Sequence, residues 1–210
     1  MRKYLLLAAA LLMLVSCENE SYDSGDTRLS YLRADFGMVH AARSGQVDFA
    51  VTDDGDRLSF VPEATVSWAG KADSVYRALI YYKKVNEYAQ AEAMQQVLVA
   101  SLYRAADVRL PLTDPLVFES AWVGGGYLNV GFSLKTGENG NGKAQSIGFM
   151  CDSTIVTPAD TTVYITMLHG QNGVPEYYSS RGYVSVSLPA GAHCVLRVNT
   201  YKGWVEKRID

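Results

Sequence analysis

Apolar residues occupy every second position along much of this chain, and glycine, proline, asparagine and aspartate separate the alternating stretches. A period of two is typical of a β-strand with one buried face. Five such stretches follow one another in the second half, with their apolar positions within 128–134, 147–151, 163–167, 184–188 and 194–198. Because each apolar face must be covered, we expect two sheets packed as an antiparallel β-sandwich over residues 113–210.

The first half predicts a β-hairpin over Val47–Pro62. Asp54-Gly55 fits a two-residue type I′ turn, because both residues tolerate the positive φ that this turn requires. This turn would put the apolar side chains on one surface, with Val51 opposite Leu58 and Phe49 opposite Phe60.

Further strands are expected on both sides of the hairpin. Apolar residues alternate over 32–38, and Tyr76–Val85 has the composition of a buried strand. The segment Glu87–Ala106 is ambiguous, because its alanine, glutamine and methionine favour a helix while Val97–Val99 and Leu102-Tyr103 favour a strand. We expect a short helix or loop there, followed by a strand.

The boundary between the two halves is predicted at Leu110–Pro115. Two prolines within this segment, Pro111 and Pro115, block regular ladder pairing. We therefore expect an N-terminal β domain over 29–110 and the sandwich over 113–210.

The N-terminus has the pattern of a bacterial lipoprotein signal peptide over residues 1–16. Arg2 and Lys3 precede the apolar run Tyr4–Val15, which is shorter than the roughly 20 residues that a membrane-spanning helix needs. Cys17 follows this run at the position of a lipidated cysteine. We expect lipid attachment at Cys17, and hence a membrane as partner through the N-terminal lipid.

Residues 17–28 predict an acidic, flexible tether, since they carry four acids and almost no apolar side chain. The acidic stretch is either a plain spacer or, by its similarity to the surface-export signal of Bacteroidetes lipoproteins, an address for the outer leaflet. We expect an outer membrane lipoprotein that faces the periplasm or the cell surface.

The charge argues against nucleic acid as a partner. Without residues 1–16, the chain has 17 basic and 22 acidic residues, a net charge of −5. Nucleic-acid binding requires a basic patch or stripe, and the sequence has none.

Cys151 and Cys194 both fall on the apolar phase of their strands. They either form a disulfide that bridges the two sheets or are two ordinary small core residues. An inward, apolar setting raises a thiol pKa, so neither is expected to be a catalytic nucleophile.

No other constellation indicates an active site. His40, His169 and His193 have no second histidine or cysteine at zinc-ligand spacing, so we expect surface or capping roles and no metal. Gly124–Gly126 is not followed by the Gly-Lys-Ser/Thr of a phosphate loop. No nucleophile motif is present either, and we expect neither a cofactor nor an enzyme.

Tyr177-Tyr178 is the candidate binding surface, near Pro175 and Arg181. Exposed tyrosines provide contact area at low entropic cost, and their rings also stack on sugars. The alternative is that one ring covers the sandwich edge and the other is half exposed.

The succession of Asp114-Pro115, Trp122, Tyr127–Val130, His169 and Arg181–Ser185 resembles the NigD-like lipoproteins of Bacteroidetes. The resemblance implies an N-terminal OB-like barrel, over 29–110, before a C-terminal β-sandwich. It also implies an immunity or accessory role without an established activity. Only Cys17 inherits a defined role from it.

These observations lead to two functional hypotheses. The first is an envelope-anchored, non-catalytic lipoprotein that binds a protein partner, in a bacteriocin-immunity-like role or as an accessory to an outer-membrane complex. The second is a surface lipoprotein that binds glycans through Tyr177 and Tyr178.

Overall fold

The computed structural model describes residues 31–138, 142, 144–158 and 160–209. The predicted signal peptide, the lipid site Cys17 and the tether 17–28 lie outside the described residues. Arg33–Asp210 forms one compact unit. Its described residues are β-structure and loops apart from one turn of 3₁₀-helix, η1 (Ala105–Asp107). No described helix is long or apolar enough to cross a membrane.

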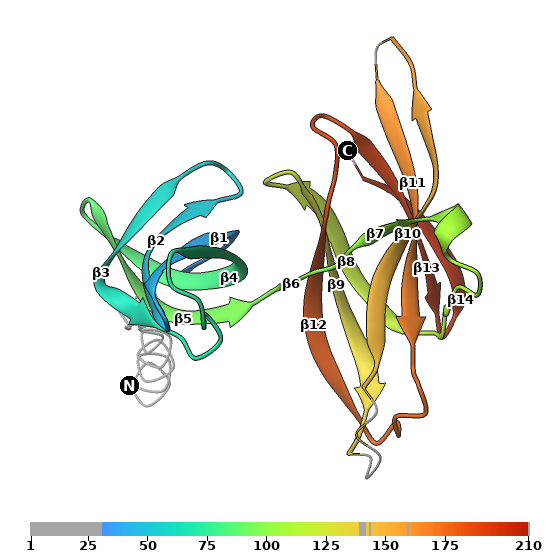
Figure 1. Ribbon diagram of the computed structural model, residues 1–210, viewed down its shortest axis with the longest axis horizontal. Coiled ribbons are helices and arrows are strands. Elements are labelled where there is room, and N and C mark those ends of the chain that lie inside the picture. The colour runs from blue at the N-terminus through green and yellow to red at the C-terminus, as the bar shows by residue number, and fades with distance from the viewer. Residues whose placement is uncertain (1–30, 139–141, 143, 159, 210) are drawn as a thin grey trace, which may run out of the picture. The chain divides into compact units, whose positions relative to one another are not determined.

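The first five strands close into a barrel in the order β1-β2-β3-β5-β4 (Figure 1). All neighbouring pairs are antiparallel except β3 and β5, which meet in parallel at Phe60 and Ala89. A five-stranded barrel of this kind is the architecture of the OB fold, so the predicted OB-like barrel is confirmed. The strands are β1 (Arg33–Arg43), β2 (Gln46–Thr52), β3 (Arg57–Thr65), β4 (Ser74–Val85) and β5 (Tyr88–Gln96).

The predicted β2–β3 hairpin forms, but its register was wrong by one residue. The turn has three residues, since Gly55 donates its N–H to Thr52 O and takes φ +90°, while Thr52 pairs with Asp56. A type I turn followed by a positive-φ glycine is the usual three-residue hairpin loop. The shift moves each side chain of β2 to the opposite face of the strand. As a result Ala50, and not Val51, pairs with Leu58 inside the barrel.

Phe49 and Val51 therefore point outward rather than into the barrel. Val51 is 38% exposed. The Phe49 ring is covered on the surface instead, stacked on His40 at 4.7 Å between ring centroids and capped by the Arg57 guanidinium at 3.6 Å.

The helix or loop expected at the start of Glu87–Ala106 is also wrong, because Tyr88–Gln96 is the strand β5. Its backbone pairs with β4 from Val85↔Tyr88 to Ala78↔Gln96. This pairing satisfies the backbone groups and buries Ala89, which outweighs the modest helix propensity of alanine and glutamine.

Sandwich pairing begins directly after the barrel, before the proline segment at 110–115. The short strand β6 (Leu98–Val99) pairs with β12, and β7 (Leu102–Arg104) pairs with β10. The two prolines lie in the connection that follows, so they interrupt the chain after it has already entered the sandwich.

The remaining strands form a four-stranded sheet, β6-β12-β9-β8, and a five-stranded sheet, β14-β13-β11-β10-β7. Three pairs are parallel: β6 with β12, β7 with β10, and β11 with β13. The strands are β8 (Val117–Gly124), β9 (Tyr127–Thr136), β10 (Ser146–Val156), β11 (Thr161–Gly170), β12 (Tyr178–Ser187), β13 (His193–Thr200) and β14 (Gly203–Ile209).

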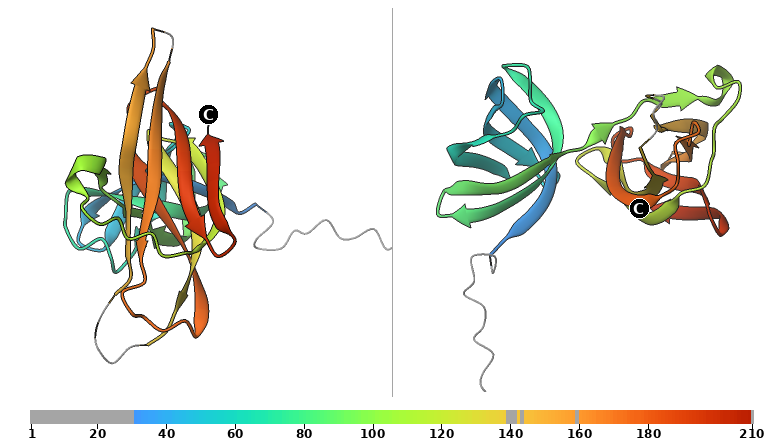
Figure 2. Two further views of the ribbon diagram at one scale, coloured as in Figure 1. Left: turned by 90° about the vertical axis from the view of Figure 1, so that its right-hand side faces the viewer. Right: turned by 90° about the horizontal axis from the view of Figure 1, so that it is seen from below.

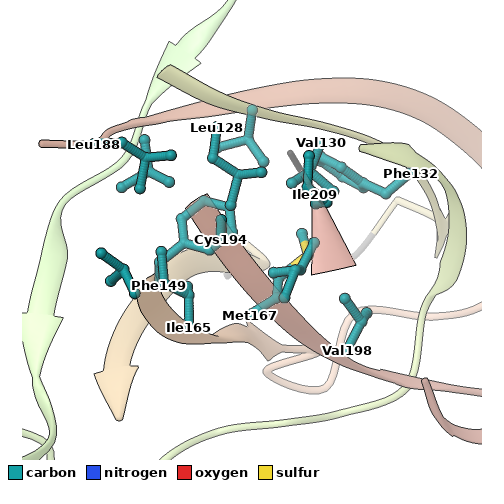
Figure 3. Close-up of a cluster of buried hydrophobic side chains, with 14 of the residues drawn as sticks. Leu128, Val130, Phe132, Phe149, Ile165, Met167, Leu188, Cys194, Val198 and Ile209 are labelled. Atoms are coloured by element: carbon teal, nitrogen blue, oxygen red, sulfur yellow. The ribbon is translucent and has the colours of Figure 1, made fainter. Parts of the chain in front are cut away.

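The five alternating stretches of the sequence are confirmed as β9 to β13. Their apolar phase builds the core between the sheets (Figure 3). The residues that are at most 2% exposed and come from the predicted phases are Leu128, Val130, Phe149, Val163, Ile165, Met167, Val184, Val186, Cys194, Leu196 and Val198.

The bridge considered for Cys151 and Cys194 is not formed, and both cysteines are free. Both lie in the five-stranded sheet, on β10 and β13, with β11 between them. Two strand spacings put their Cα atoms at least about 9 Å apart, beyond the reach of a disulfide. Burial, followed by the nearby Cys151, raises the pKa of the Cys194 thiol to about 12, so it stays protonated.

Candidate binding site

The predicted tyrosine pair lies where β12 begins, and both rings are exposed: Tyr177 by 80% and Tyr178 by 58%. Their backbone is fixed by β9. Tyr178 pairs with Thr136, and the Tyr177 N–H donates to Thr136 O at 2.9 Å. Gly137 provides room for the Tyr177 ring, because a Cβ at this glycine would come within 2.8 Å of it. The tyrosines are therefore held outward on a rigid backbone.

Lys135 lies between Glu176, which directly precedes this pair, and a third tyrosine, Tyr201, from the β13–β14 turn. Its Nζ lies 3.4 Å from Glu176 Oε2 and 4.5 Å from the centroid of the Tyr201 ring. Partial burial and then the carboxylates of Glu176 and Asp114 raise the pKa of the Tyr201 hydroxyl. This tyrosine therefore remains a neutral hydrogen-bond donor.

Beyond Tyr201 lies an apolar groove of about 260 Å³. Its wall is formed by the start of β8 and by the β13–β14 hairpin, which are far apart in the sequence. The lining residues are Leu116, Val117, Phe118, Thr200, Tyr201, Lys202 and Val205.

The local sequence holds this groove in shape. Thr200 Oγ1 donates to Gly203 O at 2.7 Å and accepts from the Lys202 N–H at 3.1 Å, which closes the hairpin turn. Asn199 Nδ2 donates to Thr113 O, and the Leu116 N–H donates to Asn199 O. These bonds place the chain before β8 against the end of β13.

We call this region the aromatic surface and define it by Tyr177, Tyr178, Lys135, Tyr201 and Val205. Of these residues, the sequence pattern predicted only Tyr177 and Tyr178. The signal for the third tyrosine was present, because an aromatic residue before Lys-Gly in a tight turn is held outward by the turn itself. The groove could not be foreseen, since it needs residues 116–118 beside residues 200–205.

A second cluster joins the barrel to the sandwich around Arg77, whose side chain is fully buried. Two guanidinium nitrogens donate to the two carboxylate oxygens of Asp53, each at 2.6 Å. Arg77 also donates to Asn129 Oδ1 at 2.9 Å and Ser185 Oγ at 3.2 Å, and it lies 4.3 Å from the centroid of the Tyr127 ring. The buried charge is paired with Asp53 and makes four hydrogen bonds, which offset the cost of its burial.

Several residues that carry the family resemblance lie at this junction, among them Trp122, Asn129 and Tyr183. Trp122 packs edge-on against Phe36 of β1 at 5.0 Å, and Tyr183 does so at 5.3 Å. A Cβ on Gly125, which has φ +59°, would lie 2.3 Å from Asp53 Oδ1. The glycines therefore admit the acidic partner of Arg77, and the motif is structural.

The histidines have structural contacts. His40 Nδ1 lies 2.7 Å from Asp48 Oδ1, and its Nε2 lies 3.2 Å from Asp73 Oδ1. These hydrogen bonds outweigh desolvation and raise the pKa of His40.

His169 is buried, so of the two expected roles, surface or capping, the surface role is wrong. Its ring nitrogens lie 3.0 Å from Asp114 O and 3.1 Å from Gln145 Oε1, which ties the segment before β8 to β11. In the described part of the chain, no three His, Cys, Asp or Glu side chains converge as metal ligands.

Comparison with known families identifies residues 104–207 as a NigD-like C-terminal beta sandwich domain. This confirms the resemblance predicted from the sequence. Among curated proteins, the comparison finds no match.

Solved structures from Bacteroides and Parabacteroides species share the fold. A NigD-like immunity protein from Bacteroides caccae superposes with a TM-score of 0.63 at 22% identity, over 83% of this chain and 91% of that one. A candidate toxin-related protein from Parabacteroides distasonis superposes with a TM-score of 0.61 at 21% identity, over 84% of this chain and 91% of that one. For a candidate lipoprotein from Bacteroides fragilis the TM-score is 0.57 at 12% identity, over 85% of this chain and 97% of that one. At these identities, the likeness concerns the fold.

Proposed function

Taking as premise that this chain carries a NigD-like C-terminal beta sandwich domain, we propose that it is a non-catalytic, lipid-anchored envelope protein that binds a protein partner. The partner contacts the aromatic surface of the sandwich. The observation that carries this proposal is the position of Lys135, which pairs with Glu176, the residue before the two exposed tyrosines, and lies over the ring of Tyr201. Tyr201 in turn lines the apolar groove.

The composition of this surface favours a protein. Tyrosine is enriched at protein interfaces, and an anchor in a small apolar pocket, surrounded by polar groups, is the usual centre of binding energy. The rings stand on a backbone fixed by β9 and by the β13–β14 turn, so little conformational entropy is lost on binding.

An immunity-like role is the form of protein binding that the relatives support. The Bacteroides caccae structure is of a NigD-like immunity protein, and the Parabacteroides distasonis structure is of a candidate toxin-related protein. An immunity protein acts by occupying a toxin, which requires a binding surface and no catalytic group. The engagement of His40 and His169 in structural contacts is consistent with this.

The outer membrane is the proposed location. Cys17 supplies the lipid, and the acidic residues after it form the tether to the described unit. The candidate lipoprotein among the structural relatives supports envelope association.

Affinity capture from outer membranes tests the proposal. We expect the mature chain to retain a protein that the double variant Tyr177→Ala and Tyr201→Ala loses by at least tenfold. Tyr88→Ala is the matched control, since Tyr88 is 53% exposed on the barrel and should leave capture unchanged.

If all variants capture the protein equally, the aromatic surface is not where the partner binds. Retention of polysaccharide instead of protein, with the same dependence on Tyr177, would favour the glycan-binding alternative.

A further inference from the structure

Strand β14 is an open edge of the five-stranded sheet. It pairs with β13 on one side, and no described strand pairs with its other side (Figure 2). Its residues from Gly203 to Arg208 are exposed, and only Ile209 is buried. In an antiparallel pair, every second residue of the outer strand directs its N–H and C=O away from the partner. The outer edge of β14 therefore offers a row of free backbone groups.

The apolar groove lies beside this edge. Val205 of β14 lines it and is 37% exposed. Val205 pairs with Val198, whose side chain is in the core, so its own side chain is on the inner face of the sheet. An added strand would therefore place alternate side chains over the groove.

Two lysines lie at this edge, Lys202 in the turn and Lys207 on β14, and neither forms an ion pair with a described residue. Arg208 lies 4.0 Å from Asp160, and Glu206 is the one acidic residue of β14. Lysines on an edge strand are a common device that disfavours edge-to-edge pairing of two copies. The same lysines attract a strand of opposite charge.

From these observations, we infer that β14 is a docking edge for an extended, acidic segment of a partner protein. The segment adds to the sheet as a further strand and places an apolar side chain in the groove beside Val205. Strand addition of this kind takes affinity from main-chain hydrogen bonds and specificity from pockets for alternate side chains. The inference rests on the proposed protein-binding function and names the chemistry of the bound segment.

Synthetic peptides test this directly with the full mature chain. The probe is a seven-residue peptide in which glutamate alternates with valine, and the control peptide carries lysine in place of glutamate. We expect the acidic peptide to bind at least tenfold more tightly. The net charge of the mature chain is −5, so general electrostatics would favour the opposite order.

Two variants locate the binding. Lys207→Glu and Val205→Asp should each weaken the acidic peptide at least fivefold. Their matched controls are Lys71→Glu and Val75→Asp, at exposed positions of the barrel, which should have no effect. Hydrogen exchange should show new protection confined to residues 203–209.

The outcomes separate this inference from the proposed function. The docking edge would be overturned if neither peptide binds, if binding shows no charge preference, or if the new protection lies outside β14. Capture of a protein that depends on Tyr177 and Tyr201 would still support the proposed function. Self-association of the chain that protects 203–209 would also overturn it, because the occupant would then be a second copy.

Discussion

At the scale of single residues, the two charged clusters differ in how far water reaches them. The Arg77 side chain is fully buried with four hydrogen bonds, whereas His40 is near the surface between two carboxylates. A buried charge without its partner costs much more than an exposed one, so substitutions at the two sites should have very different effects.

We expect Arg77→Ala to destabilise the chain by about 3–5 kcal/mol, because Asp53 would be left without its partner. Arg57→Ala, which removes an exposed guanidinium above Phe49, should cost about 1 kcal/mol or less. Urea unfolding measures both. The double variant Asp53→Ala and Arg77→Ala should lose less stability than the two single variants lose together, because neither charge is left without its partner. Additive losses would contradict the pairing.

His40 should make stability depend on pH in one direction. Hydrogen bonds to Asp48 and Asp73 raise its folded pKa above the ordinary 6.5. Its contribution is therefore fully present below pH 6.5 and is lost as the pH rises through the folded value. We expect His40→Gln to lower the melting temperature at pH 6 and to have a smaller effect at pH 9. A constant difference over this range would contradict the charged pair.

At the scale of elements, alternation alone predicted the strands whose apolar phase faces a core, from β9 to β13. It failed at β5, where Ala89 and its neighbours have helical propensity and only the partner β4 decides the structure. It also gave the wrong β2–β3 register, because Asp54-Gly55 fits both a two-residue and a three-residue turn. The groove beside Tyr201 was missed because residues 116–118 meet residues 200–205 only in the folded sheet.

The β2–β3 turn gives a prediction at this scale. Gly55 has φ +90° and open space around it, so Gly55→Ala should cost about 1 kcal/mol through backbone strain alone. Gly70→Ala is the matched control, since Gly70 also has open space but no positive φ. Thermal unfolding compares the two, and equal effects would contradict the three-residue turn.

At the scale of the whole molecule, the residues that stabilise the described unit differ from those proposed to bind a partner. Buried contacts around Arg77 join the barrel to the sandwich through residues that carry the family resemblance, whereas the exposed aromatic surface uses residues largely outside that set. We therefore expect related chains to share the junction and to differ at the aromatic surface proposed to bind a partner.

If a protein partner contacts the aromatic surface, a crosslinker placed in that surface should capture it. A benzophenone amino acid is placed at Tyr201 or, as control, at Tyr88 of the barrel, and each protein is illuminated on isolated outer membranes. We expect a discrete protein adduct from position 201 and none from position 88. No adduct at 201, or the same adduct from both positions, would contradict it.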